Sequence, residues 1–353
     1  MHPTTTTTMP HLPIEIILQI IDTLTDFGRV RPVAIDAKDD RARLLYSLLT
    51  VSTTVHSVAK RHLWSSCMYI DSPHRLELLL RSLNEPPFSY ALQPLVTSLY
   101  LSPYHGNIDN AQTAAQIHSL FSIIGLTLKR LVSNVPLRSL YPEEDMNLVR
   151  PVLRKAYMQL ARLEEFTSVS DELFLATKPD HWNNEPEPEV WASWPKLRNL
   201  ALYNVQVSES WADHVKSMAH LETLALTRAD GLAQYPLPQM FAQRNDFRTL
   251  RLLIINEATF NFKDNVNMGL GETYQSDFGN EVAVPDMRDF KGTVDIVNVP
   301  VTIYGGLENS IKGIQRRVRD AALADTLWAG EGWWTGVDAA MKYRTSQKNR
   351  WLY

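Results

Sequence analysis

The chain has 353 residues, of which 44% are hydrophobic and 21% are charged, an ordinary globular composition with room for about two or three domains. Its 35 Lys and Arg residues against 39 Asp and Glu residues give a formal charge of -4, so no overall positive charge would attract it to nucleic acid or to anionic lipid. The single cysteine, Cys67, excludes an intrachain disulfide and a site built on paired thiolates, and it favours a reducing compartment.

Residues 1–11 carry a run of threonines between two prolines and predict a flexible tail. This N-terminus lacks the apolar core of a secretory signal, and no later stretch reaches the ~18 apolar residues of a membrane span. We therefore expect a cytoplasmic or nuclear protein that has no membrane partner.

Residues 12–70 predict a small helical module. In residues 13–24 the polar side chains fall into one narrow stripe, so apolar side chains cover most of the helix circumference. Such a helix needs cover on two sides, and its own domain can supply one of them. The module would contain helices at residues 13–24, 44–51 and 55–63, a charged loop at 27–43 and a short strand at 67–70.

A repeated motif dominates the rest of the chain. The spacing L-x-x-L-x-L, or a close variant, recurs six times with starts 24 to 35 residues apart. Each motif fits a strand that buries alternate residues, and each connection is long enough for a helical return, so the strands would run parallel. This is the leucine-rich-repeat pattern with irregular length, and the alternative is six chance leucine-rich strands in another α/β fold. The motifs begin at Val96, Leu128, Leu163, Leu197, Leu221 and Phe247.

The strand residues that point away from this core predict an exposed concave face. One row is polar at all six positions and the row beside it is mixed, which indicates an uneven surface with a binding patch. We expect Tyr100, Arg130, Tyr203 and Arg251 to bind a substrate there. The polar row is Ser98, Arg130, Glu165, Asn199, Thr223 and Thr249, and the mixed row is Tyr100, Val132, Thr167, Ala201, Ala225 and Arg251.

The array is expected to span residues 71–305 and to contain two long loops, at 177–195 and 256–290. Alternating valines around Pro300 predict an edge strand at residues 294–303. Apolar residues at helical spacing after Leu307 predict a helix that caps the end of the array, and the tryptophan-rich stretch that follows either covers that end or contacts a partner. Residues 306–353 would form this C-terminal cap and tail.

Motifs for catalysis are missing from the sequence. The glycines match neither a dinucleotide fingerprint nor a P-loop, and there is no G-x-S-x-G or H-E-x-x-H. Cys67 follows an apolar helix and has no local signal for a thiolate. We therefore predict no catalytic residue, no metal site, no cofactor and no nucleic-acid partner. An enzyme whose site is assembled from distant residues in the two long loops would leave no motif and is an alternative.

The N-terminal residues resemble the F-box motif. In that family L-P-x-E-I opens the first helix, and a V-S-x-x-(W/F/H)-x-x-x-A segment and a closing L-W follow a leucine-rich turn. The segment from Thr25 to Arg43 departs from the family pattern, which joins its first two parts by a few residues. The matches are Leu12, Pro13, Glu15, Ile16, Ile20, Leu24, Leu48, Val51, Ser52, His56, Ala59, Leu63 and Trp64.

The whole chain is similar to fungal-type F-box proteins with irregular leucine-rich repeats. The resemblance implies an α/β protein, in which a three-helix F-box module precedes a leucine-rich-repeat solenoid with a parallel sheet and a capping helix. It also implies a non-enzymatic adaptor of a Skp-cullin-F-box ubiquitin ligase, with the module on the Skp subunit and the repeats on a protein substrate. A repeat scaffold without a ligase role is the alternative. The residues expected to face or support the Skp contact are Leu12, Pro13, Ile16, Ile20, Leu48, Val51 and Trp64, while Ile17 and Leu45 are expected in the core.

Overall fold

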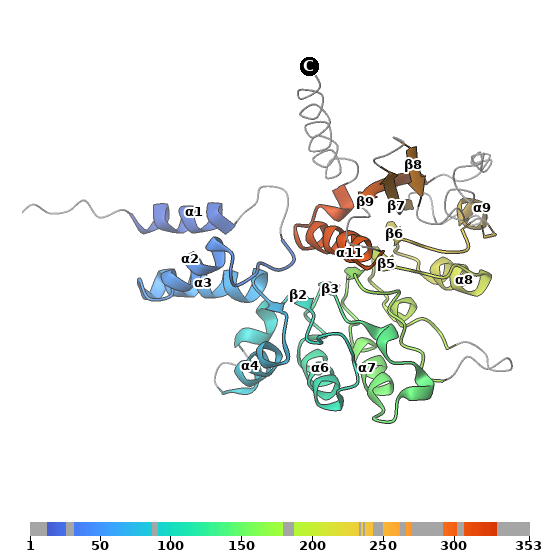
Figure 1. The fold of residues 1–353 in the computed structure, drawn as a ribbon. Helices are drawn as coiled ribbons and strands as arrows, with labels where there is room; N and C mark the ends of the chain where they lie inside the picture. The colour runs from blue at the N-terminus through green and yellow to red at the C-terminus, as the bar shows by residue number, and fades with distance from the viewer. Residues whose placement is uncertain are drawn as a thin grey trace, which may run out of the picture.

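The computed structural model describes residues 13–25, 32–86, 91–178, 187–232, 234–235, 237–242, 250–261, 266–269, 292–301 and 307–329. Over these residues the chain is a mixed α/β protein, with a group of N-terminal helices beside a curved, largely parallel sheet (Figure 1). The predicted tail, Leu12, most of the loop predicted at 256–290 and the tryptophan-rich C-terminus lie outside the described residues.

Three helices form the N-terminal module, as predicted. The second begins earlier than expected because the Asp39 side chain caps it, accepting a hydrogen bond from the backbone N–H of Arg41. Ser52 caps the third helix by accepting from the backbone N–H of Val55. The helices are α1 (Ile14–Thr25), α2 (Asp40–Leu48) and α3 (Thr53–Ser66). Their shared core is small and consists of Ile21, Leu45, Val55, Ala59 and Leu63.

A nine-stranded sheet follows the module. Strands β1 to β7 pair in chain order and in parallel, β9 adds to β7 in parallel, and β8 pairs with β7 in the antiparallel direction. The strands are β1 (Tyr69–Ile70), β2 (Ser98–Leu101), β3 (Arg130–Ser133), β4 (Glu165–Ser168), β5 (Asn199–Tyr203), β6 (Thr223–Thr227), β7 (Arg251–Asn261), β8 (Val266–Gly269) and β9 (Thr293–Val301). Because β1 pairs with β2, the sheet begins just before the boundary predicted after residue 70.

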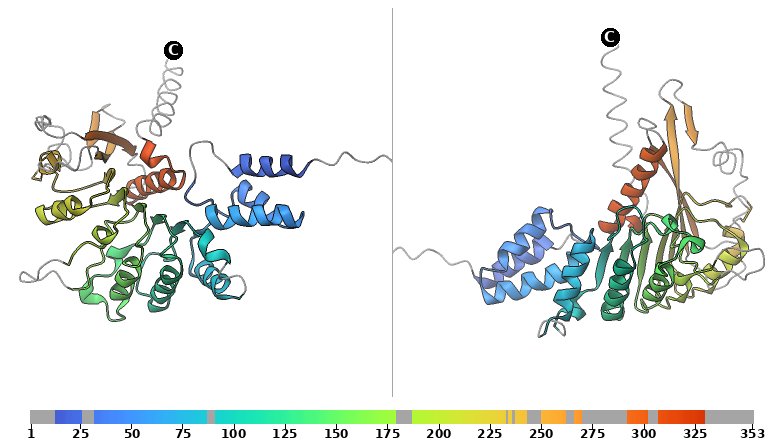
Figure 2. Two further views of the ribbon diagram at one scale, coloured as in Figure 1. Left: turned by 180° about the vertical axis from the view of Figure 1, so that it is seen from behind. Right: turned by 60° about the horizontal axis from the view of Figure 1, so that its bottom comes forward.

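Helices that connect the parallel strands cover one face of the sheet (Figures 1 and 2). They are α4 (Pro73–Asn84), α6 (Ala111–Ile124), α7 (Val149–Tyr157), α8 (Glu209–Ser217) and α9 (Leu237–Ala242). Shorter 3-10 turns complete the connections, at η1 (Gln93–Leu95), η2 (Leu137–Ser139), η3 (Pro142–Glu144) and η4 (Val190–Ser193).

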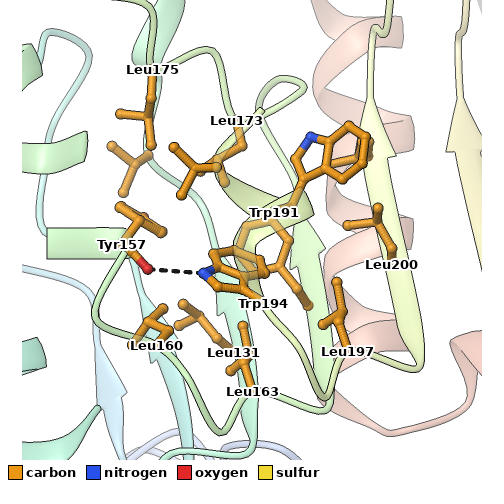
Figure 3. Close-up of a cluster of buried hydrophobic side chains, with 14 of the residues drawn as sticks. Leu131, Tyr157, Leu160, Leu163, Leu173, Leu175, Trp191, Trp194, Leu197 and Leu200 are labelled. Atoms are coloured by element: carbon orange, nitrogen blue, oxygen red, sulfur yellow. Dashed lines mark hydrogen bonds between the residues drawn. The ribbon is translucent and has the colours of Figure 1, made fainter. Parts of the chain in front are cut away.

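One continuous core lies between these helices and the sheet. The motif leucines fill it, and Leu99, Leu200 and Leu224 are completely buried. Between β4 and β5 the described part of the connection contains only the short turn η4, and two of its tryptophan rings fill the space there. The Trp194 indole N–H donates to the backbone oxygen of Tyr157 at 3.0 Å (Figure 3). Large rings therefore supply the apolar volume that an α-helix supplies in the neighbouring connections.

The strand register confirms five positions of the predicted polar row and corrects the sixth. Ser98, Arg130, Glu165, Asn199 and Thr223 are successive partners across the sheet. The partner of Thr223 is Arg251, so the predicted place of Thr249 in this row is wrong by two residues. Side chains alternate along a strand with a period of two, so a two-residue slip leaves each residue on its expected face and alternation does not reveal it.

The predicted C-terminal helix is present as α11 (Leu307–Leu323), but its predicted position over the end of the array is wrong. It lies across the sheet face opposite α4, α6, α7 and α8 (Figures 1 and 2). The buried α11 side chains Ile314, Val318 and Ala322 share a second core with sheet residues such as Val132 and Leu253. The mixed row of strand residues is apolar enough to pack against a helix, and α11 is the helix that packs there.

The segment predicted as a charged loop between the first two helices packs tightly where it is described. Val33, Ala34 and Ile35 are buried. The backbone N–H of Val33 donates to the carbonyl oxygen of Leu323 at 2.8 Å, and that of Ile35 donates to the carbonyl oxygen of Ser66 at 2.7 Å. This segment therefore connects the helical module to the C-terminal end of α11.

Candidate functional site

Tyr100 and Tyr203, two of the four predicted substrate-binding residues, are buried on the α11 face of the sheet. Their exposed fractions are 2% and 3%, and they belong to the core that α11 shares with the sheet. The prediction that these side chains lie on an open concave face is wrong, because a helix more than 100 residues further along the chain covers that face.

The two predicted arginines of this face make internal contacts. Arg130 forms an ion pair with Asp325 at 3.7 Å and donates to the carbonyl oxygen of Pro32 at 3.2 Å. Arg251 forms an ion pair with Asp295 at 2.5 Å, and its guanidinium also donates to the carbonyl oxygen of Trp328, in the turn η6 (Leu327–Ala329). Both side chains therefore hold other segments of the chain against the sheet.

The helical module carries an exposed apolar surface, which we call the α1 face and define by Ile16, Ile20 and Val51. Ile16 and Ile20 lie one turn apart on α1 and are 43% and 46% exposed. Val51, in the turn between α2 and α3, is 59% exposed. Ile17 and Leu18, on the opposite side of α1, pack against the module core. One side of this apolar helix is thus covered by its own domain and the other is open.

The orientation of α1 on α3 is fixed by a polar contact as well as by the core. Asp22 accepts a hydrogen bond at 3.0 Å on its Oδ1 atom from the Nε2 atom of His62 on α3. Asp22 belongs to the narrow polar stripe predicted for α1. Asp22 thus contacts α3, while Ile16 and Ile20 stay exposed.

The remaining predicted contact residues have different positions. Pro13 is exposed at the start of α1. Leu48 is partly buried against the module core, as is expected of a supporting residue, and Leu45 is fully buried there. Trp64 packs against the main core of the sheet, so it joins α3 to the array and does not belong to the α1 face.

A pocket of about 220 Å³ opens at the carboxyl ends of β4 and β5, an edge of parallel sheets where ligands commonly bind. Its walls come from the segments after β3, β4 and β5 and from the helices α7 and α8. Both ends of the long loop predicted at 177–195 contribute to it. The side chains that carry charge or rings are Arg138, Arg154, Glu172, Phe174, Lys178, Glu187, Glu189, Trp211 and His214.

A buried arginine, Arg150 of α7, organises the loops that form this pocket. Its guanidinium donates to four backbone carbonyl oxygens and lies 4.5 Å from the centre of the Phe174 ring. The side chain is completely buried. The four acceptors are the carbonyl oxygens of Leu137 (2.9 Å), Leu140 (2.6 Å), Phe174 (2.7 Å) and Ala176 (2.6 Å).

Asp171 complements this arrangement from the loop after β4. Its buried carboxyl group accepts from the backbone N–H groups of Leu137 at 2.7 Å, Leu173 at 2.9 Å and Arg138 at 3.3 Å. Burial and the neighbouring Glu172 raise the pKa of Asp171 to about 7. Arg150 and Asp171 together tie the loop after β3 to the loop after β4 and so fix the pocket wall.

Two arginines of the pocket are already neutralised. Arg138 donates to both carboxylate oxygens of Glu172, and this pairing raises the pKa of Arg138. Arg154 donates to the carbonyl oxygens of Leu175 and Pro188 and lies 3.9 Å from the Glu187 carboxylate. Their N–H groups are therefore committed to partners within the chain.

Glu189 and His214 differ from these paired groups. Glu189 forms no ion pair with any residue that the structure describes, and burial, followed by the charge of Glu172, raises its pKa to about 7. The charge of Arg154 and the Trp191 indole act in the opposite direction and favour its ionised form. The Nδ1 atom of His214 is buried without a hydrogen-bond partner in the described part of the chain. Together with the exposed Lys178, these two groups are the part of the pocket wall that is open to a ligand.

The sequence predicted none of these pocket residues, because they come from segments far apart in the chain. The only signal was the length of the loop at 177–195. Cys67 ends α3 instead of lying in a strand, and burial raises the pKa of its thiol to about 12. In the described ranges we find no cluster of three His, Cys, Asp or Glu residues suited to a metal ion, and no helix long and apolar enough to cross a membrane.

No protein-family model matches this chain, and no curated protein sequence matches it. Its function must therefore be inferred from its own residues and their geometry.

Proposed function

We propose that the protein is a non-catalytic adaptor of a Skp-cullin-F-box ubiquitin ligase. In this proposal α1 to α3 form the F-box, which binds the Skp subunit, and the sheet and its helices form an irregular leucine-rich-repeat array, which binds a protein substrate. The observation that carries the proposal is the exposed α1 face, because it lies on residues that match the F-box motif: Ile16, Ile20 and Val51.

The energy available from this face suits a docking surface. Burying an isoleucine or valine side chain that is otherwise exposed contributes roughly 1.5–3 kcal/mol. A few such residues at the centre of a contact carry most of the binding energy of a typical interface of about 1,600 Å². Leaving Ile16 and Ile20 in water without a partner would make α1 a poor surface helix.

The link between the module and the array supports an adaptor role. Trp64 inserts from the end of α3 into the main core, and the Ser98 hydroxyl on β2 donates to the carbonyl oxygen of Ser65 at 2.7 Å. The segment 32–35 adds a second connection, to α11. A protein bound on the α1 face would thus have a fixed orientation relative to a substrate on the array, which raises the effective concentration of one near the other.

The test is capture of the purified Skp adaptor by the full-length chain. We expect wild type to bind, and Ile16→Asp combined with Ile20→Asp to weaken binding at least about 100-fold, the factor that corresponds to a loss of about 3 kcal/mol. Leu126→Asp is the matched control, because Leu126 is an exposed apolar residue in the turn after α6, outside the module. Circular dichroism checks that each variant folds.

Two results would overturn the proposal. One is no capture by the wild type, which would favour the alternative of a repeat scaffold without a ligase. The other is unchanged capture by a folded double variant, which would place the Skp contact elsewhere.

A further inference from the structure

In the pocket at the carboxyl ends of β4 and β5, some charged side chains are neutralised by partners within the chain and others are not. Arg138 is paired with Glu172 and Arg154 lies beside Glu187, so these four charges largely cancel. Glu189 is left with no ion pair from the described residues, and the buried Nδ1 atom of His214 has no hydrogen-bond partner among them. The groups that remain for a ligand are the Glu189 carboxyl group, the His214 imidazole and the exposed Lys178 ammonium, whose charge acts on the Glu187 carboxylate.

We propose that this pocket binds a lysine or arginine side chain of the protein substrate, with the Glu189 carboxylate as its ionic partner. This inference rests on the proposed function, since only an adaptor role calls for a protein substrate. It also moves the substrate contact from the sheet face covered by α11 to the edge of the sheet.

The size of the pocket suits a single side chain. Its volume of about 220 Å³ is below the roughly 300–1,000 Å³ typical of sites for small-molecule ligands. Phe174, Val205 and Trp211 form apolar parts of the wall. Long basic side chains bury their aliphatic stems against such surfaces, and an indole face attracts the cationic end.

The charges favour a cation over an anion. A phosphate or carboxylate would have to displace the carbonyl oxygens of Leu175 and Pro188 from Arg154, or Glu172 from Arg138, to gain the N–H donors of these arginines. The third basic side chain of the wall, Lys178, already interacts with Glu187. It would also lie near the carboxyl groups of Glu172 and Glu189. A basic side chain leaves the partners of both arginines in place. It stabilises the ionised form of Glu189, whose pKa burial raises to about 7.

The experiment uses the full-length chain and two probes, the Nα-acetyl methylamides of arginine and lysine, with the glutamate analogue as the anionic counterpart. Binding is followed by nuclear magnetic resonance of the histidine Cε1–H groups, with the His214 signal identified by its loss in His214→Gln. We expect a saturable shift of this signal with a basic probe and no shift with the glutamate analogue. Glu189→Gln should weaken binding about tenfold or more.

Two further variants make the readout specific. Glu189→Asp retains the charge but shortens its reach, and we expect it to bind between wild type and Glu189→Gln. Glu209→Gln is the matched control, because Glu209 is an exposed acid at the start of the helix that carries His214 and is not part of the pocket wall. It should bind the basic probes as wild type does.

Three results would overturn the inference: no shift with either basic probe, an equal or larger shift with the glutamate analogue, or unchanged affinity in folded Glu189→Gln. Skp capture is measured on the same Glu189→Gln protein and should be unaffected. If wild type fails to capture Skp but binds the basic probes, the adaptor proposal fails and the cation site stands. If it captures Skp but not the probes, the reverse holds.

Discussion

The helical module and the sheet with its covering helices, here called the array, bury their apolar side chains to very different degrees. In the array the motif leucines lie under the connecting helices and the opposite sheet face lies under α11, so both faces are covered. In the described part of the module the buried core consists of five residues, and Ile16 and Ile20 remain open to solvent. The array therefore completes its own core, whereas the small module leaves part of its apolar surface exposed to solvent.

The two regions also differ in how they use polar groups. The array buries Arg150 completely and satisfies it with four carbonyl oxygens. The polar contact between α1 and α3, from His62 to Asp22, lies nearer the surface. Buried polar groups whose hydrogen bonds are all formed make the array rigid, and removing one of them lowers the free energy of unfolding strongly. This difference between the regions can be tested by substitution.

The largest effect is expected from Arg150→Met. The substitution leaves four carbonyl oxygens without their donor in a buried site, so we expect a loss of about 3–5 kcal/mol in the free energy of unfolding, measured by urea denaturation. Arg198→Met is the control, because Arg198 forms an exposed ion pair with Glu222, and such pairs contribute about 0–1 kcal/mol. Equal losses in the two variants would contradict the role assigned to Arg150.

Much of the array could be predicted from the sequence because its signal is local. Alternation of leucines with polar residues places the side chains of β2 to β6 on the correct faces of the sheet. The register confirms the polar row from Ser98 to Thr223. The slip at Thr249 arose because a two-residue error preserves alternation. With the correct register the sixth position of the neighbouring row is Leu253, and the row also contains Val132, Ala201 and Ala225, an apolar surface that indicates a covered face.

The position of α11 and the pocket could not be predicted in this way. The residues around Tyr100 and Tyr203 do not indicate which distant segment covers them, because α11 begins only at Leu307. The pocket depends on Arg150 and Asp171, which are ordinary polar residues in the sequence and acquire their role when three loops converge. The α1 face, by contrast, could be predicted because the amphipathic pattern of a single helix shows that it has more apolar surface than one contact needs.

A smaller effect is expected in the module. Ile21→Val removes one methyl group from a core of five residues, and we expect a loss of about 1 kcal/mol in the free energy of unfolding. Ile16→Val makes the same chemical change on the α1 face and should leave stability within about 0.5 kcal/mol. Hydrogen exchange of the α3 amides measures both. If Ile16→Val costs as much as Ile21→Val, the α1 face is not open in solution and the contrast between the regions fails.

The smallest effect, a gain of stability in Gly313→Ala, sharpens the comparison within the array when it is set beside a loss at Gly125. Gly313 lies inside α11, where an added Cβ would meet no atom within 4 Å, so Gly313→Ala should stabilise the protein by about 0.5–1 kcal/mol by favouring the helix. Gly125, at the end of α6, is the contrasting position, because its Cβ would lie 2.5 Å from the carbonyl oxygen of Phe121 and 2.7 Å from that of Gln159. Gly125→Ala should therefore destabilise by about 1–3 kcal/mol. Thermal unfolding of both variants measures the sign of each change in stability.

Opposite signs in the two variants would show that α11 lies over the sheet with space beside it, whereas α6 and the chain after α7 are in backbone contact. A loss of stability in Gly313→Ala would instead mean that α11 is packed as closely as the helices of the opposite face.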